Sequence, residues 1–234
     1  MTLRLHAVRF DANDPARLAQ FWAGVLRREL AEDGVTLLPV TATEVPIHFV
    51  PASAPKTELG RAHFDLTSAS AEEQDETVQR VLDLGGRHLD IGQSPDDEHV
   101  VLADPEGNEL CVIEPGNKFL AGCGFVGAFN WDGSQEVGYF WSRALGWPLV
   151  WDQEQETAIQ SPAGGMKVSW GGPPVRPRST NDRLHMELVA DTDAEIDRLI
   201  SLGATRTANS EVDSASRDVV MADPDGNEFR LVVG

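Results

Sequence analysis

The 234-residue chain has few cysteines and few basic residues, and each shortage excludes a class of protein. Only Cys111 and Cys123 are present, too few for a disulfide framework, and neither belongs to a CxxC or CxxxH pattern typical of a structural zinc site. The 19 Lys and Arg residues stand against 38 Asp and Glu residues, and no basic cluster interrupts this acidic balance. Such a charge repels phosphate backbones and anionic lipids, so we expect neither a nucleic-acid partner nor a membrane-surface partner.

Long apolar runs are also missing. No stretch approaches the ~20 residues of a membrane span, and the N-terminal MTLRLHAVRF lacks the basic and apolar regions of a signal peptide. We therefore expect a cytoplasmic protein without membrane contacts. What the chain does contain is 41% hydrophobic residues, enough to bury the core of one large domain or two smaller ones.

An internal repeat organises the chain. The segment ADPEGNE at residues 103–109 returns as ADPDGNE at residues 222–228, 119 positions later. Landmarks repeated in the same order indicate a duplicated domain. A turn-forming stretch at 115–118 separates the halves, so we place the domains at residues 1–117 and 118–234. The other repeated pairs are Phe21-Trp22 with Phe140-Trp141, and residues 61–66 with residues 183–188.

Within each half, segments whose apolar residues recur at the period of a helix alternate with segments whose apolar residues recur at the period of a strand. Apolar residues at i, i+3, i+4 and i+7 predict four amphipathic helices, and alternation at period two predicts strands between them. The DP[DE]GN stretch has Pro and Gly where a hairpin turn needs them. Each half therefore contains two strand–helix–strand units, in an α+β protein with mostly antiparallel sheets. The helices begin at Asn13 or Asp14, at Ser70 (with Glu73), at Ser134 and at Thr192 (with Glu195), and the last three end at Gly85, Gly146 and Gly203.

Four βαβββ-like units, paired into two domains that each close on a DP[DE]GN turn, resemble the vicinal oxygen chelate superfamily of glyoxalases, bleomycin and fosfomycin resistance proteins, and extradiol dioxygenases. The DPARLAQFW segment at residues 14–22 is similar to glyoxalase-like domains that occur as tandem pairs. The resemblance covers essentially the whole chain. It implies an α+β fold of two tandem glyoxalase-like domains, each a pair of βαβββ units forming a curled, mostly antiparallel sheet that lines a cup. Whether a cup forms within one half or between the halves stays open.

The resemblance also implies positions for a divalent metal. The ligands are His, Gln or Glu on the first strand, His or Glu on the fifth, and Glu on the last. His63 and His185 match the fifth-strand position, and His6 lies close to the first-strand position. The last-strand position holds Cys111 in the first half and Arg230 in the second. Because Arg cannot ligate a cation, we expect the metal site of the second half to be lost.

The first half leaves another arrangement open. Alternate residues of a strand share a face, so Glu109 should lie on the same face as Cys111. His6, His63, Glu109 and Cys111 would then form a shifted set able to hold a divalent metal, with Cys111 itself a ligand in one version. Without that set, no cofactor is expected.

Histidine and aromatic residues supply the remaining candidates. His63 and His185 are candidate catalytic groups, since a cup-lining His can transfer protons near neutral pH; a structural role is the alternative. Trp131, Trp151, Trp170 and Arg230 are candidate ligand-binding residues, although aromatic residues also fill cores.

The sequence thus predicts a protein, monomer or homodimer, that binds a small molecule in a sheet-lined cup, with the usual metal site degenerate. The alternative is a divergent lyase or isomerase of the glyoxalase type that uses His63 or His185 as general acid or base, with metal dependence in the first half. The cup with His63 is the one expected to be reactive, because only the first half offers His6, Glu109 and Cys111 as partners.

Overall fold

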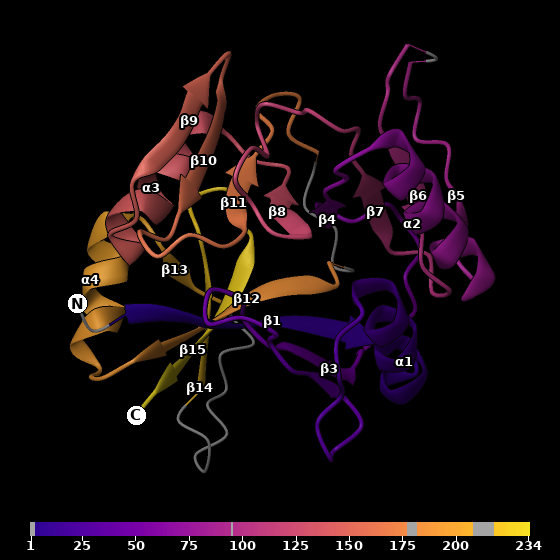
Figure 1. The fold of residues 1–234 in the computed structure, drawn as a ribbon. Helices are drawn as coiled ribbons and strands as arrows, with labels where there is room; N and C mark the ends of the chain where they lie inside the picture. The colour runs from indigo at the N-terminus through magenta and orange to yellow at the C-terminus, as the bar shows by residue number, and fades with distance from the viewer. Residues whose placement is uncertain (1–2, 95, 177–181, 208–217) are drawn as a thin grey trace.

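The computed structural model describes residues 3–94, 96–176, 182–207 and 218–234 as two mixed sheets with helices packed on them (Figure 1). None of the helices in these ranges has the length and apolar character needed to cross a membrane. The helices are α1 (Pro15–Leu26), α2 (Ala71–Asp83), α3 (Gln135–Leu145) and α4 (Ala194–Leu202). Sheet A contains β1 (Leu3–Ala12), β2 (Thr36–Leu37), β3 (Ile47–Pro51), β12 (Leu184–Ala190), β13 (Thr205–Arg206), β14 (Asp218–Ala222) and β15 (Glu228–Val233). Sheet B contains β4 (Ala62–Leu66), β5 (Arg87–His88), β6 (Val100–Ala103), β7 (Glu109–Val112), β8 (Val126–Trp131), β9 (Leu149–Gln153), β10 (Glu156–Gln160) and β11 (Lys167–Trp170).

Four units of related topology build these sheets, the first with three strands and the others with four. Unit 1 is β1 to β3 with α1, unit 2 is β4 to β7 with α2, unit 3 is β8 to β11 with α3, and unit 4 is β12 to β15 with α4. In each unit the first strand pairs in parallel with the last, and the other pairings are antiparallel. The α+β class, the repeated units and the mostly antiparallel sheets are therefore confirmed.

Each sheet draws one unit from each half of the sequence. Units 1 and 4 meet where β1 pairs with β12, and units 2 and 3 meet where β4 pairs with β8, both antiparallel. In Figure 1 the indigo strand β1 lies beside the orange strand β12, from the opposite end of the chain. The two units of one half thus lie in different sheets, rather than forming one sheet as the resemblance implied. A cup on either sheet is therefore formed by both halves of the sequence.

The helix ends follow their local sequence with one exception. The Ser70 side chain caps α2 by accepting a hydrogen bond from Glu73 N, as predicted. The start predicted at Thr192 lies one residue too early, because Asp193 is the N-cap of α4. The three predicted end glycines have positive φ, at Gly85, Gly146 and Gly203.

The most strongly repeated motifs join the two units of one half. Trp22 of α1 donates from Nε1 to Asp104 in the turn of unit 2, and Trp141 of α3 donates in the same way to Asp223 in unit 4, at 3.2 and 3.0 Å. The next acidic residue of each turn caps the same helix, since Glu106 accepts from the backbone at the start of α1 and Asp225 from Ser134 before α3. The FW and DP[DE]GN repeats are therefore structural contacts between sheets.

The core continues from sheet A into sheet B as one cluster of buried apolar side chains. Trp22 packs edge-on against Phe64 of β4 with ring centroids 5.6 Å apart, and Phe64 packs against Phe129 of β8 at 5.2 Å. Trp131 extends this row, 5.1 Å from Phe129, and is 2% exposed. Helices of one half also contact each other, α1 with α2 and α3 with α4.

The buried turn carboxyls predict an unusual dependence of stability on pH. Burial raises the pKa of Asp104 and of Asp223 from 3.8 to about 6, although N–H donors such as those of Asn108 and Asn227 oppose the rise. An acid with a higher pKa in the folded state binds more protons there, so its contribution to stability is largest below pH 3.8 and is lost as pH rises through 6. The two groups together should make the protein about 2–3 kcal/mol more stable at pH 5 than at pH 7.

The measurement is the midpoint of thermal unfolding, Tm, between pH 5 and pH 7, expected to rise by several degrees on acidification. Relief of repulsion among surface carboxylates acts in the same direction, so the series is repeated in about 0.5 M NaCl, which screens exposed charges. A Tm that falls steadily from pH 7 to pH 5 in that salt would contradict the assignment to buried carboxyls.

Candidate functional site

A cavity of about 370 Å³ opens on one face of sheet B. Its floor comes from both halves of the chain, because β4 and β7 belong to unit 2 while β8 and β11 belong to unit 3. Register places His63 opposite Asn130, Asn130 opposite Ser169, and Asp65 opposite Cys111, and all five residues line the cavity. We call this cavity and its lining the cup of sheet B.

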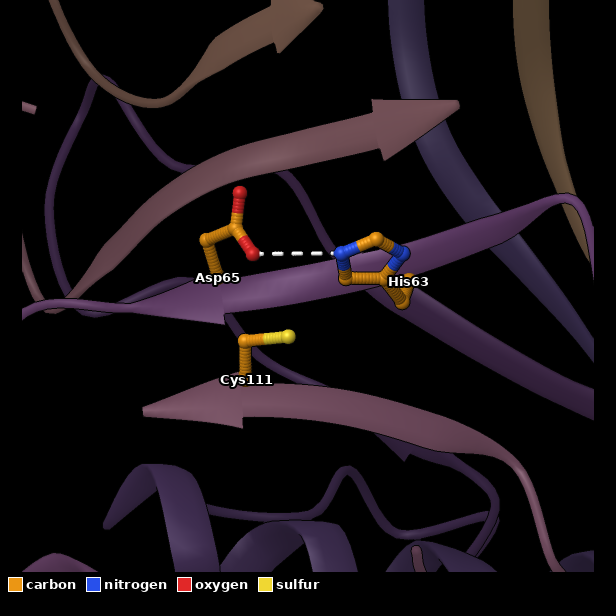
Figure 2. Close-up of side chains that lie close together, drawn as sticks. All are labelled: His63, Asp65 and Cys111. Carbon is orange, nitrogen blue, oxygen red and sulfur yellow. Dashed lines mark ion pairs between the residues drawn. The ribbon is translucent and has the colours of Figure 1, made fainter. Parts of the chain in front are cut away.

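Three side chains converge at the floor of the cup (Figure 2). His63 and Asp65 are two residues apart on β4 and so share a face, and Cys111 of β7 lies beside them. His63 Nε2 is 3.3 Å from Asp65 Oδ1, and one ligand atom from each of the three residues lies within 4.8 Å of the other two. Asp65 and Cys111 are 5% and 7% exposed, and His63 is half-buried.

The surroundings favour a charged imidazole at His63. Burial by itself lowers the pKa of His63, but interactions with Cys111 and Asp65 outweigh it and hold the pKa well above 6.5. Perturbed titration in a cavity is typical of functional sites, although structural ion pairs cause it too. The cup therefore offers a proton donor beside a buried carboxylate and a thiol.

The opposite side of the floor has a polar atom with no protein partner. Ser169 is 3% exposed, and its Oγ accepts and donates no hydrogen bond within the described residues. Thr157 and Trp170, which also border the cavity, have unpartnered polar atoms in the described chain as well. Their side chains lie on the other face of the sheet, where Thr157 packs against Gly138 of α3 and Trp170 against Gly133, just before that helix. Ser169 alone of these three faces into the cup, since it shares the register of Asn130.

An aromatic side chain covers part of the cup. Phe119 lines the cavity from the connection between β7 and β8. Buried Lys167, two residues before Ser169, donates to the Phe119 carbonyl and lies 4.9 Å from the centroid of its ring. This contact fixes Phe119 above the floor of the cup.

The four residues predicted as a metal set do not come together. His6 is exposed on β1 of sheet A, with its ring 6.0 Å from that of His48, whereas His63, Glu109 and Cys111 belong to sheet B. The sheet exchange between units causes this separation, because the first strands of units 1 and 2 go to different sheets.

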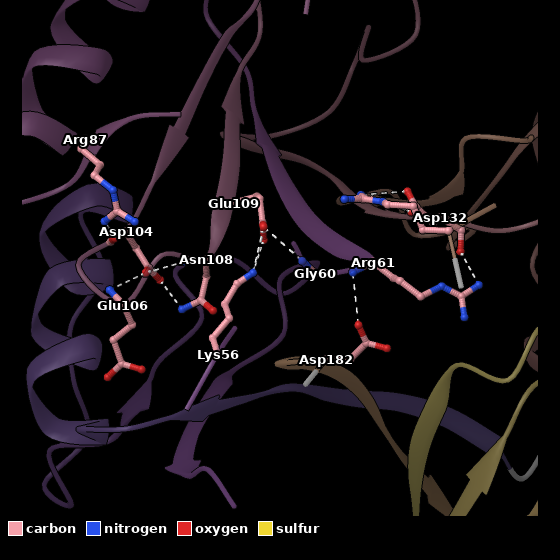
Figure 3. A network of polar contacts seen from close by, with 11 residues as sticks. Lys56, Gly60, Arg61, Arg87, Asp104, Glu106, Asn108, Glu109, Asp132 and Asp182 are labelled. Carbon is pink, nitrogen blue, oxygen red and sulfur yellow. Dashed lines mark hydrogen bonds and ion pairs between the residues drawn. The ribbon is translucent and has the colours of Figure 1, made fainter. Parts of the chain in front are cut away.

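Glu109 is engaged elsewhere. Both of its carboxylate oxygens accept from Lys56 Nζ, at 2.8 and 2.9 Å, and one accepts from Gly60 N (Figure 3). Both charged side chains are less than one-tenth exposed, so the ammonium already compensates the carboxylate. The resemblance-derived set of histidines and a carboxylate therefore does not fit the residues that face the cup.

His185 and Arg230 belong to sheet A and do not line the cup of sheet B. The ring nitrogens of His185 face the backbone carbonyls of Asp182 and Glu228, at 3.1 and 3.3 Å. Arg230 forms an ion pair with Asp218 at 3.4 Å. The two candidate catalytic histidines therefore occupy different sheets and different surroundings.

Of the three candidate tryptophans, only Trp151 is near the cup through its side chain. Its ring is 5.4 Å from that of Phe119. Trp131 belongs to the core on the face of β8 opposite Asn130, and Trp170 pairs in register with it on that same face. The default role of aromatic residues, filling the core, applies to these two.

Sequence reasoning named neither Asn130 nor Ser169 as cup residues and gave Asp65 no role in the site. Period-two alternation places Asp65 on the same face as His63. Asn130 and Ser169 carry no such local pattern, because their place opposite His63 depends on the pairing of β4 with β8 across the two halves.

Comparisons with known proteins agree with this architecture. A family model described as a glyoxalase-like domain matches residues 7–113 and 128–232. Glyoxalase I from Zea mays superposes with a TM-score of 0.67 at 13% identity, over 99% of this chain and 92% of that one. A putative dioxygenase from Bacillus subtilis subsp. subtilis str. 168 has a TM-score of 0.61 at 15% identity, over 99% of this chain and 85% of that one. Identities this low show the fold alone. No curated protein matches the chain.

Proposed function

Because the chain belongs to the glyoxalase-like domain family, with one copy of the domain in each half, we propose that it binds a small molecule in the cup of sheet B. The observation that carries the proposal is a 370 Å³ cavity into which polar side chains from both halves point while buried Ser169 Oγ has no partner among the described residues. Buried polar groups are nearly always satisfied, so an unpaired hydroxyl facing a cavity favours a ligand that pairs with it.

The lining indicates the kind of ligand. Protonated His63, Asn130 and Ser169 offer hydrogen-bond donors along one row of the floor, while Ile113 and the Phe119 ring supply apolar contact. A compact molecule with a carbonyl or hydroxyl group attached to an apolar or aromatic part matches this pattern. The volume is at the low end for ligand cavities, which favours a ligand of small size.

We expect Ser169→Leu to weaken such binding at least tenfold, since the larger side chain fills the floor of the cup. Ser169→Ala, which removes only the hydroxyl, should weaken it about three- to tenfold. Benzaldehyde, acetophenone and phenol are suitable test compounds, with affinity measured by ligand-detected NMR on the full chain.

The matched control is His48→Leu, because His48 pairs with Arg9 in sheet A as Ser169 pairs with Asn130 in sheet B. It should leave affinity within about twofold, with Tm measured for all variants. Binding that is equal in wild type and Ser169→Leu would refute the cup of sheet B as the site.

A second candidate function is that of a lyase or isomerase, favoured by the contact of His63 with Asp65 at the floor of the same cavity. In this role protonated His63 donates a proton to an oxygen of the bound molecule, and the Asp65 carboxylate stabilises the charged imidazole. Asn130 and Ser169, across the floor, hold the reacting group in place. His185 also has a carboxylate nearby, since its Nε2 is 3.9 Å from Asp11 Oδ2, but both ring nitrogens lie closer to backbone carbonyls, at 3.1 and 3.3 Å.

A further inference from the structure

We propose that a second cavity, between sheets A and B, binds a small carboxylate that has an apolar chain or ring. This inter-sheet cavity has a volume of about 300 Å³, and no described residue lines both it and the cup of sheet B. Its apolar walls come from sheet A (Val8 and Ile47) and from sheet B (Phe64 and Val126). The inference does not rest on ligand binding in the cup of sheet B.

A buried arginine carries the proposal. Arg28, two residues after α1, lines the inter-sheet cavity, and its side chain is 5% exposed. Its Nε and Nη2 donate to three backbone carbonyls of residues 37–45, at 2.7 to 3.5 Å, whereas Nη1 donates to no acceptor within the described residues. Because a largely buried donor without an acceptor costs free energy, Nη1 favours a ligand that supplies an oxygen atom.

The positive charge of Arg28 is only partly compensated by the protein. The three carbonyls are neutral, and the Glu44 carboxylate lies 3.8 Å from Nε while the same oxygen accepts from Val40 N at 2.7 Å. Burial lowers the pKa of Arg28, although Glu44 opposes this effect, so the cation is less favourable here than in water. A ligand carboxylate at Nη1 compensates the guanidinium through a charge-assisted hydrogen bond.

The rest of the lining suits the apolar part of such a ligand. Val45 and Met166 extend the apolar surface of the four wall residues. The volume is at the lower limit for ligand cavities, so one aromatic ring or a chain of about six carbon atoms fits it. This combination of one cationic donor and apolar walls is the reason for proposing a compact carboxylate.

Segments from both halves close the rim of the inter-sheet cavity. Thr43, in the loop before β3, lies against Gly165 between β10 and β11, where any side chain would collide with the Thr43 carbonyl oxygen. Gln160 Nε2 donates to the Gly165 carbonyl at 2.7 Å and to Cys123 Sγ at 3.7 Å. These contacts connect three lining segments, so the rim is held in place on more than one side.

The internal repeat indicates that the fold does not require a cation at this position. Arg28 corresponds, at the offset of 119 positions, to Trp147, which packs against the core as a partly buried apolar side chain. Burying a guanidinium costs more free energy than burying an aromatic ring. Arg28 therefore suits a binding role in addition to its contacts with residues 37–45.

The test titrates the full chain with benzoate and with hexanoate by ligand-detected NMR, in about 0.15 M NaCl to screen distant surface charges. We expect both carboxylates to bind, and benzamide, the uncharged counterpart of benzoate, to bind at least about tenfold more weakly. Arg28→Met removes the cation and Val126→Phe fills the cavity, so each should weaken benzoate binding at least about tenfold. Glu44→Gln removes a negative charge from the lining and should tighten benzoate binding about two- to fivefold.

Arg183→Met is the matched control, because Arg183 is also less than one-tenth exposed and donates to backbone carbonyls but lies outside the lining. Its benzoate affinity should stay within about twofold of that of wild type. Near-UV circular dichroism checks folding, and the gain in affinity of Glu44→Gln gives an independent result if Arg28→Met does not fold.

Ser169→Leu, which fills the cup of sheet B, separates this proposal from the earlier one and should bind benzoate as wild type does. Benzoate binding that is lost in Ser169→Leu and kept in Arg28→Met would place the anion in the cup and overturn the inter-sheet site. Binding of neither carboxylate to wild type, equal affinity for benzamide, or weaker benzoate binding by Glu44→Gln would also overturn it. None of these three results affects the proposal for the cup, which depends on Ser169→Leu and the neutral test compounds.

Discussion

Residues 1–117 are expected to lose the cooperative unfolding transition of the full chain when they are expressed alone. This half contains units 1 and 2, whose first strands β1 and β4 pair with β12 and β8 of the other half. Without those partners both central strands become open edges, and the apolar cluster that continues across both sheets is cut. The net stability of a domain is only about 5–15 kcal/mol. We therefore expect the loss of these strand pairings and apolar contacts to exceed the stability that the isolated half retains.

Far-UV circular dichroism during heating and analytical ultracentrifugation measure the outcome. Residues 1–117 alone should give a broad, weak transition or associate, because a second copy can offer strands to the open edges. Co-expression with residues 118–234 should restore one sharp transition. A monomeric 1–117 fragment with a cooperative transition near that of the full chain would show that one sequence half is a folding unit, contrary to this expectation.

Loss of His63 is expected to lower turnover about 10²–10⁴-fold for any substrate that reacts in the cup of sheet B. His63 lines the cavity beside Asp65, so its removal takes away the group placed to donate a proton. His185→Ala removes the counterpart from unit 4, in sheet A, and should change turnover less than about threefold. The separate measurement of kcat and KM distinguishes a proton-transfer role, which lowers kcat, from a binding role, which raises KM.

His63→Gln refines the comparison, because an amide keeps hydrogen bonding without proton transfer and should be nearly as slow as His63→Ala. Equal effects of His63→Ala and His185→Ala would place catalysis outside the cup of sheet B. Full turnover in His63→Ala would exclude this residue from the chemistry.

Local rules explain the parts of the fold that the sequence predicts. The caps at Ser70 and the end glycines act within a few residues, so helix positions follow from the neighbouring chain. The DP[DE]GN turn likewise contains its own hydrogen bonds, from Asn108 N and Glu106 N to the Asp104 carboxylate. The repeated motifs do not indicate where the candidate site lies. Its clearest landmarks, Trp22 and Asp104, bond to each other across the two sheets and lie outside the cup.

The sequence by itself determined the duplicated α+β fold, the four units, the family resemblance and the position of His63 and Cys111 in a cup. Only the tertiary structure decided which units share a sheet, and with that which residues meet. It separated His6 from His63, placed Asn130 and Ser169 opposite His63, and joined Lys56 to Glu109. The physical reason is that helix caps, turns and strand alternation depend on residues a few positions apart. The pairing of strands depends instead on packing between residues that are far apart in the sequence, in the case of β1 and β12 more than a hundred positions. No local pattern in this chain encodes that choice, and the site depends on it.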